Sequence, residues 1–288
     1  MTTEDAADRK PGRPAPMWAL ALLVAAGGCI GTLARALLES AFATPHGHLP
    51  VTTLLINLVG SLILGMLLEG LARTGDDIGV RKAVRLGVGT GVIGGFTTYS
   101  TFMVEIDRLI GGGSAALGLI YAVGSVVAGV LCAVAGITVA RRAVSRLERR
   151  PESPGSAGPA GSKGQGGPPM IWLFVSLAGG LGSATRFVVD SWIARHNRLN
   201  TPMGTIVINV TASFVLGLAT GMGIDHTMTK AWTSVIGTGF CGGYSTFSTA
   251  SVEGARLFLS GRTRAGLLHG GGMLLLSTLA AGLGMVIG

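Results

Sequence analysis

The sequence predicts an all-α integral membrane protein made of two homologous four-helix repeats. Three observations predict this class. Of the 288 residues, 48% are hydrophobic and only 12% are charged; the apolar residues form eight long stretches; and one set of motifs occurs twice. A stretch of about 20 apolar residues is long enough to cross the hydrocarbon core of a bilayer as a helix. The composition is therefore typical of a membrane protein.

The eight stretches are the predicted spans. They comprise residues 17–38, 51–71, 84–110 and 115–140 in the first half, and 170–192, 202–222, 231–259 and 265–288 in the second. Polar sequence precedes each half. We predict a polar tail (1–16), a first repeat (17–140), a linker that is basic and then rich in Pro, Gly and Ser (141–169), and a second repeat (170–288).

The internal duplication is read from three pairs of motifs. In the first spans, GGCIG before Arg35 matches GGLG before Arg186. In the second spans, TTLLINLVGSLILG, with Asn57, matches GTIVINVTASFVLG, with Asn209. In the third spans, GVIGGFTTYSTFMVE matches GFCGGYSTFSTASVE. Such self-similarity at a fixed spacing indicates two copies of one structural unit.

Polar side chains inside the spans are candidate functional residues, because polar groups are costly in a bilayer. Asn57 and Asn209 each carry an amide into the second span of a repeat, and Thr53 and Thr205 lie one turn earlier on the same face. One interpretation is that the two asparagines hold helices together. Their recurrence beside the third-span motif favours the alternative, in which they line a pore.

The third span of each repeat is predicted to be broken. A glycine pair followed by Thr and Ser disfavours a continuous helix, since Gly is permissive and hydroxyls compete for backbone groups. A break at membrane depth exposes carbonyls that can bind a cation. Close helix packing against the glycines is the alternative interpretation, and both can hold.

Together these motifs resemble the Fluc/CrcB family of fluoride channels. The resemblance covers nearly everything except the tail and the linker. It implies four-helix units that pair antiparallel in the plasma membrane and release fluoride passively, giving resistance to its toxicity. A pore for so strongly hydrated an ion must replace water with neutral donors. The partners implied are fluoride, the lipid bilayer, and the other repeat or a second copy of the chain.

The resemblance also implies particular site residues. A structural sodium ion, the implied cofactor, would be held by the carbonyls of Gly94, Thr97, Gly242 and Ser245. Two phenylalanines per family subunit lie along the ion path, and the matching positions here are Tyr99, Phe102, Phe247 and Ala250. In the fourth span, Tyr121 and Ser125 match the polar positions of the family, whereas the second repeat has His269 and Met273.

The departures from the family pattern are Tyr99, Ala250, His269 and Met273, and all of them fall in one of the two expected pores. If each pore draws its two rings from different repeats, Phe102 and Phe247 complete one pore, and Tyr99 with Ala250 leaves the other short of a ring. We therefore expect one conducting and one degenerate pore. Arg35 and Arg186, near the ends of the first spans, are interpreted as snorkelling to the membrane surface. The roles of Glu105 and Glu253 stay open.

Basic residues predict the orientation but set up a conflict. In the first repeat they lie with the amino terminus, opposite Arg108, which places the amino terminus in the cytoplasm. In the second repeat the bias is reversed, with Arg195, Arg198, Arg256, Arg262 and Arg264 against Lys230. Four spans return the chain to the cytoplasm, so inverting the second repeat requires a crossing that the hydrophilic linker does not supply. Four resolutions stay open: one apolar stretch does not span, the second repeat inserts against its charge bias, two fused chains pair with each other, or the chain is a fusion of two originally separate subunits.

Three rival functions compete with the channel. A small dual-topology multidrug exporter needs a carboxylate deep in a span, and the acidic residues lie near span ends. A non-transporting membrane scaffold explains the helices but not the repeated motifs. An enzyme is the least favoured, because no nucleophile, base and orienting group recur at catalytic spacing.

Overall fold

The structure is a computed structural model that describes residues 15–45, 47–147, 170–198 and 201–288. Every regular element in these residues is a helix. The first repeat contains α1 (Met17–Ala41), α2 (Val51–Thr74), α3 (Gly79–Val84), the π-helix η1 (Arg85–Ile93), α4 (Gly94–Phe96), α5 (Ser100–Gly111) and α6 (Ala115–Leu147). The second contains α7 (Met170–His196), α8 (Met203–Ile224), α9 (Lys230–Thr233), η2 (Ser234–Cys241), α10 (Gly242–Tyr244), α11 (Phe247–Leu259), α12 (Thr263–Leu267), η3 (Leu268–Gly272) and α13 (Met273–Ile287).

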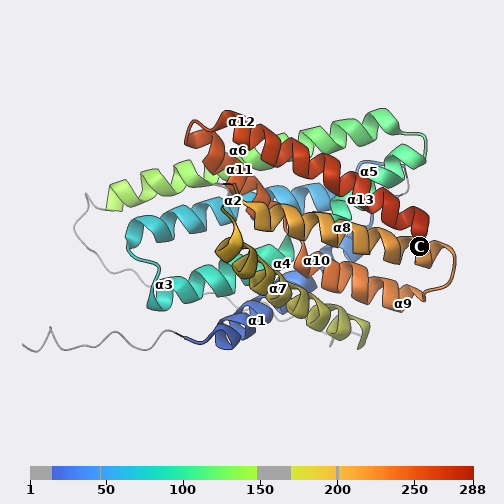
Figure 1. Ribbon diagram of the computed structural model, residues 1–288, viewed down its shortest axis with the longest axis horizontal. Coiled ribbons are helices and arrows are strands. Elements are labelled where there is room, and N and C mark those ends of the chain that lie inside the picture. The colour runs from blue at the N-terminus through green and yellow to red at the C-terminus, as the bar shows by residue number, and fades with distance from the viewer. Residues whose placement is uncertain (1–14, 46, 148–169, 199–200) are drawn as a thin grey trace, which may run out of the picture.

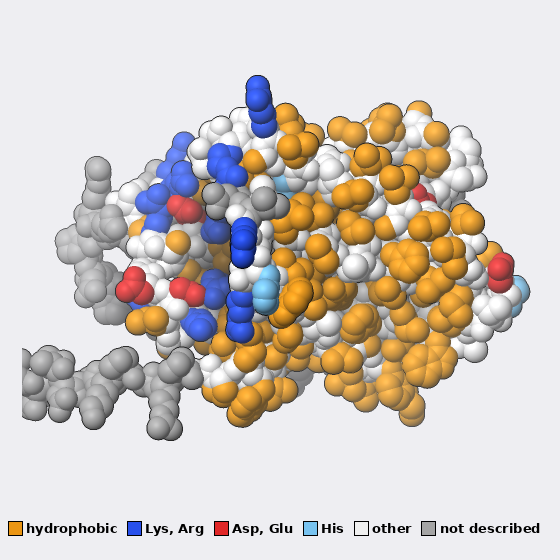
Figure 2. Space-filling view, viewed as in Figure 1, with side chains coloured by type: hydrophobic (Ala, Val, Ile, Leu, Met, Phe, Trp, Pro, Cys, Tyr) orange, Lys and Arg blue, Asp and Glu red, His pale blue; other side chains and the backbone are white. Residues whose placement is uncertain are grey.

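Six helical stretches are long and apolar enough to cross a membrane. They are α1, α2, α6, α7, α8 and the α12–α13 run, and they coincide with six of the eight predicted spans. The other two predicted spans are interrupted after α4 and after α10, which confirms the prediction that the third helix of each repeat is broken. Apolar side chains cover most of the visible surface between the two ends of the bundle (Figure 2), as expected of a multi-pass membrane protein.

The two repeats contact each other in opposite directions. Gly28 of α1 lies against Ser183 of α7, and Thr32, one turn later in α1, lies against Gly179, one turn earlier in α7. This reciprocal order means that the two helices are antiparallel. Figure 1 shows the same relation, because α1 and α7 begin at opposite ends of the bundle. The all-α, two-repeat, antiparallel arrangement predicted from the sequence is thus what the structure shows.

The antiparallel arrangement brings the basic loops of both repeats to one end. Lys and Arg gather at the end of the bundle where α3 and α12 lie (Figure 2). At this end Arg85 forms an ion pair with Asp77, and the hydrogen bonds from Arg85 hold the pKa of the Asp77 carboxyl below its usual value. The positive-inside rule predicts that this end is cytoplasmic. The opposite charge biases of the two repeats therefore agree once the repeats are inverted.

Helix α6 continues to Leu147, past the predicted boundary at residue 140. Arg141, predicted to begin the linker, is helical, and its guanidinium pairs with Glu69 of α2 at 2.8 Å. The remainder of the predicted linker, and almost all of the predicted tail, lie outside the described residues.

Glycines let α1 approach the π-helix η1 closely. A Cβ on Gly31 would overlap the carbonyl oxygen of Val92, whereas a Cβ on Gly124 of α6 would have no atom within 4 Å. We expect Gly31→Ala to destabilise the protein by about 1–3 kcal/mol, because backbone must move. Thermal unfolding in detergent checks this, with Gly124→Ala as the matched control. Equal melting temperatures for the two variants would contradict the close contact.

Candidate ion pathway

The two helix breaks face each other at the centre of the bundle. Thr97 and Ser245 follow α4 and α10 in extended conformation, with ψ of 150° and 164°, and both are fully buried. The hydroxyl of Ser245 lies 3.0 Å from that of Ser100 and accepts the N–H of Tyr99 at 3.2 Å. The hydroxyl of Thr97 lies 2.9 Å from that of Ser248. Hydroxyls of one repeat thus satisfy backbone donors that the break frees in the other.

Asn57 and Asn209 hold the two breaks in place. The amide nitrogen of Asn57 donates to the carbonyl of Thr98 at 3.0 Å, and its oxygen accepts the N–H of Thr98 at 3.0 Å. Asn209 makes the same pair of bonds to Thr246, at 3.1 and 2.9 Å. Both asparagines are buried. The geometry therefore gives both asparagines a structural role at the helix breaks. This role is compatible with lining a pore.

These bonds leave carbonyls near the breaks without their helical donors. The N–H of Thr98, four residues after Gly94, donates to Asn57, and that of Thr101, four residues after Thr97, donates to the Thr98 hydroxyl at 3.3 Å. In the second repeat the corresponding donors go to Asn209 and Thr246, which frees the carbonyls of Gly242 and Ser245. Unwound carbonyls of this kind suit a sodium ion, so the residues present fit the implied cation.

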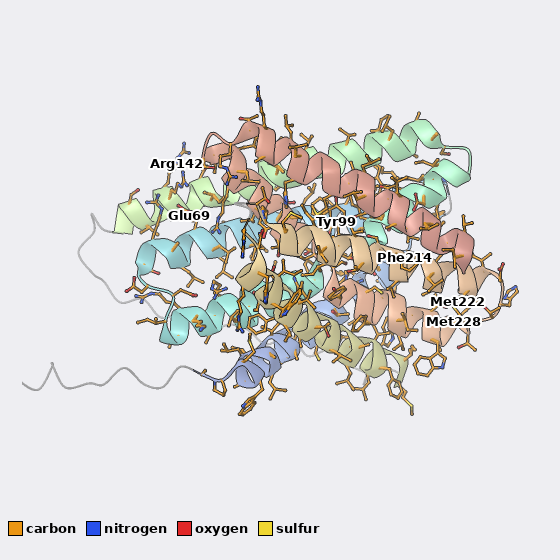
Figure 3. The ribbon with its side chains drawn as sticks, viewed as in Figure 1. Glu69, Tyr99, Arg142, Phe214, Met222 and Met228 are labelled. Atoms are coloured by element: carbon orange, nitrogen blue, oxygen red, sulfur yellow. The ribbon has the colours of Figure 1, made fainter. Side chains whose placement is uncertain are left out.

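An aromatic cluster spans the two repeats next to the breaks. The rings of Phe102 and Phe247 meet edge to face with centroids 5.5 Å apart, and Tyr121 meets Phe102 edge to face at 5.0 Å. Tyr99 also joins the cluster, 5.7 Å from Phe102 and 5.9 Å from Phe247. Tyr99 lies near the middle of the bundle, between Glu69 and Arg142 at one end and Met222 and Met228 at the other (Figure 3).

Beside Phe102, polar groups of the first repeat form a connected track. Glu105 accepts hydrogen bonds from the Thr53 hydroxyl at 2.6 Å and the Tyr121 hydroxyl at 2.7 Å. One turn after Tyr121, the buried hydroxyl of Ser125 has no hydrogen-bond partner among the described residues. A buried donor without a partner is costly, so Ser125 is suited to bind a passing anion.

The corresponding positions of the second repeat carry different side chains. Met273 replaces Ser125, and its sulfur accepts from the amide nitrogen of Asn209 at 3.3 Å. His269 replaces Tyr121 and lies 3.6 Å from Glu253, to which Thr205 also hydrogen-bonds. Tyr99, Ala250, His269 and Met273 share one mainly apolar cavity of about 500 Å³, which Phe247 also lines. The Asn209 amide thus donates here to a thioether, whereas the equivalent position of the first repeat carries the unpartnered hydroxyl of Ser125.

Cavities that polar and charged residues line in part open at both ends of the bundle. At the end opposite the basic loops, cavities of about 730 and 450 Å³ both reach Thr101, Glu105 and Arg108. At the basic end, a cavity of about 390 Å³ is lined by three arginines and two carboxylates: Arg81, Arg85, Arg256, Asp77 and Asp190. Basic residues in an entrance concentrate anions near it.

Arg35 and Arg186 are not at the membrane surface, and their interpretation as snorkelling side chains is wrong. They are 0% and 4% exposed. Arg35 donates to the carbonyl of Thr238 in η2 at 2.5 Å, and Arg186 donates to the carbonyl of Thr90 in η1 at 2.7 Å. Each π-helix thus offers a carbonyl to the arginine of the other repeat. Sequence reasoning missed this pair, since neither π-helix was predicted.

Comparison with known proteins agrees with this architecture. The profile of a family described as CrcB-like protein, Camphor Resistance (CrcB), matches residues 22–137 and 173–286, one match in each repeat. The chain belongs to this CrcB-like family. Relatives include fluoride-specific ion channel FluC 1 of Leifsonia xyli subsp. xyli, 48% identical over 120 residues, and FluC 2 of Cutibacterium acnes, 47% identical over 120 residues. No solved structure matches the chain.

The lengths of these CrcB-like relatives show that each corresponds to one repeat. The aligned segments cover 88% and 98% of the two relatives but only 42% and 41% of this chain. FluC of Acidobacterium capsulatum, 43% identical over 122 residues, is covered to 96% while accounting for 41% of this chain. This CrcB-like chain is therefore two family units joined end to end.

Proposed function

We propose that this chain is a fluoride-selective ion channel of the plasma membrane, which releases fluoride passively and gives resistance to it. The relatives named as fluoride-specific ion channels support fluoride as the transported ion. The observation that carries the proposal is the buried pair of rings, Phe102 and Phe247, one from each repeat, beside the unpartnered hydroxyl of Ser125. Ring edges are partly positive and face an anion favourably in a dry passage.

We infer that one path conducts and the other is degenerate. The conducting path follows Thr53, Asn57, Phe102, Tyr121 and Ser125, and takes Phe247 from the second repeat. In the other, Ala250 supplies no ring and Met273 covers the amide of Asn209, so an anion entering beside Tyr99 and Thr205 meets an apolar cavity. A bare apolar passage gives a hydrated anion no substitute for its water.

A sodium ion held by the carbonyls of Gly94, Thr97, Gly242 and Ser245 would join the two breaks. It would supply a fixed positive charge where the repeats meet. The freed carbonyls support this assignment, which is a structural role and not a catalytic one. The proposed activity is transport by a channel and involves no enzymatic step.

Fluoride efflux from liposomes tests the function. Purified protein is reconstituted, and release is followed with a fluoride electrode beside parallel chloride-loaded vesicles. We expect rapid fluoride release with little chloride release. Well-folded protein that releases neither ion would exclude the channel and leave the exporter and scaffold alternatives.

A further inference from the structure

The apolar cavity of about 500 Å³ in the second path lies between α6, α11 and the α12–α13 run. Figure 1 shows α6 and α12–α13 along the same side of the bundle. Val123 and Val127 of α6 and Leu267 of α12 line the cavity, and all three are exposed on the apolar surface that a bilayer would cover. The cavity therefore opens sideways, toward the lipid.

Local features of the second repeat create this space. Ala250 takes the place that Phe102 has in the first repeat, so the ring that would fill the space is missing. Residues 268–272, LHGGG, form the π-helix η3, whereas the matching span of the first repeat, α6, is an unbroken α-helix. A Cβ on Gly270 would meet only Val126 within 4 Å, at 3.6 Å. Short π-helical segments are frequent at functional sites, and this one forms a wall of the cavity.

Two buried polar side chains line the cavity without hydrogen-bond partners among the described residues. The hydroxyl of Tyr99 has no partner, and neither have the two ring nitrogens of His269. The two residues are 1% and 3% exposed, so bulk water does not reach them. The nearest carboxylate to His269, that of Glu253, lies 3.6 Å away, beyond hydrogen-bond distance. A buried polar atom without a partner is costly, so a ligand group that bonds to it gains affinity.

We propose that this cavity binds a neutral amphiphile from the bilayer, a short apolar chain that carries one hydroxyl group. The sideways opening admits a molecule that is dissolved in lipid. The rest of the lining is apolar or small, and none of its described residues is Lys, Arg, Asp or Glu, so a charged headgroup has no partner there. A cavity of about 300–1,000 Å³ with apolar walls and a few polar groups is the usual form of a small-molecule site.

Phe247 connects this site to the conducting path. Its ring lines the cavity, and the ring centroids of Phe247 and Phe102 are 5.5 Å apart. On the side of α6, a Cβ on Gly129 would overlap the Phe247 ring, so the ring has little free space there. A bound amphiphile would restrict the ring on its open side as well. Slower fluoride release is the expected consequence; it rests on the proposed function, whereas the binding itself does not.

Photolabelling with octanol that carries a diazirine group tests the site. The purified chain is reconstituted in liposomes, irradiated with the probe, digested and mapped by mass spectrometry. We expect label on Tyr99 or Phe247, which are buried and line the cavity, and loss of that label in excess octanol. Label on Leu275, which is exposed on α13 outside the cavity, measures non-specific contact with the probe. Label confined to exposed residues such as Leu275 would overturn the proposal.

Matched variants show where the probe binds and what it recognises. Gly270→Leu puts a side chain into the cavity, whereas Gly272, two residues later, does not line it, and Gly272→Leu is the control. We expect the buried label to be lost in the first variant and kept in the second, and equal labelling would overturn the site. Tyr99→Phe removes the unpaired hydroxyl and is expected to lower the label on Phe247 about fivefold, the value of one hydrogen bond. Labelling of this variant at the wild-type level would mean that the cavity accepts any apolar chain, a phospholipid acyl chain included, and would overturn the hydroxyl-bearing ligand.

Fluoride release with and without octanol measures the effect on the path. The ratio of the two rates is expected to fall in the wild type and in Gly272→Leu, and to stay unchanged in Gly270→Leu. An equal effect on the two glycine variants would mean that octanol acts through the bilayer, and would overturn the link to Phe247. A wild-type chain that is labelled at the cavity but releases no fluoride would instead refute the proposed function and leave the binding site standing.

Discussion

Fluoride release is expected to fall at least about tenfold when either Phe102 or Phe247 is replaced by isoleucine. Isoleucine keeps much of the apolar volume but removes the partly positive ring edge that faces the ion. Loss of about 1.4 kcal/mol of stabilisation at the narrowest point corresponds to a tenfold change. Both substitutions act on one path, because the two rings are 5.5 Å apart and come from different repeats. The measurement is the initial rate of release from liposomes at equal protein content.

Matched variants distinguish a loss of conduction caused by the altered path from a loss caused by poor folding or reconstitution. Phe174 is 51% exposed on α7, and Phe174→Ile is expected to leave the rate unchanged. Ala250→Ser and Met273→Leu alter the path that we infer to be degenerate, and they too are expected to conduct as the wild type does. A large loss of flux in the Met273 variant, with normal rates in both phenylalanine variants, would reverse the assignment of the two paths.

Much of the fold follows from local sequence. The apolar runs predict the spans, and the break in the third span is predicted because Gly94 and Gly95 precede a run rich in hydroxyl residues. What the sequence does not show is where the freed backbone groups find partners. Asn57 was predicted to lie in the second span, but its paired bonds to Thr98 depend on how two helices meet. Such contacts are tertiary and leave no local pattern.

The aromatic cluster is a second feature that could not be predicted from the sequence alone. The matching of positions assigned Tyr99 to one path and Phe102 with Phe247 to the other. In the structure the ring of Tyr99 contacts both phenylalanines, while its hydroxyl is buried without a partner among the described residues. Tyr99 therefore packs against both of the rings that were assigned to the other path. Alternating faces of a broken helix cannot be resolved from spacing alone, because the break resets the helical phase.

The two arginines illustrate why position in a span can mislead. A lone arginine near the end of an apolar stretch is usually interpreted as reaching for the membrane surface. Arg35 instead reaches the second repeat, and this requires an acceptor that an ordinary helix does not offer. The π-helical turn around Thr238 provides the acceptor, a main-chain carbonyl to which Arg35 donates. Neither the π-helix nor the opposed repeat is visible in the sequence around Arg35.

Arg35→Ala is expected to destabilise the assembly by about 3–5 kcal/mol, the usual cost of breaking a buried ionic group. Three contacts are lost at once: the Thr238 carbonyl, the Gly95 carbonyl at 3.4 Å, and Glu39 at 3.1 Å. A lysine at this position carries the charge but only a single point donor, so Arg35→Lys is expected to recover little. The measurement is the midpoint of thermal unfolding in detergent, followed by loss of helical circular dichroism.

The control for this prediction is Arg142→Ala, which removes an exposed arginine near the end of α6 and is expected to move the midpoint little. Arg186→Ala should behave like Arg35→Ala, because its bond to the Thr90 carbonyl is the equivalent contact in the other direction. If Arg35→Ala and Arg142→Ala unfold at the same temperature, the arginine does not hold the two repeats together. Equal losses in the Arg35 and Arg186 variants would instead show that both arginines contribute to the antiparallel contact, since each donor belongs to one repeat and each acceptor to the other.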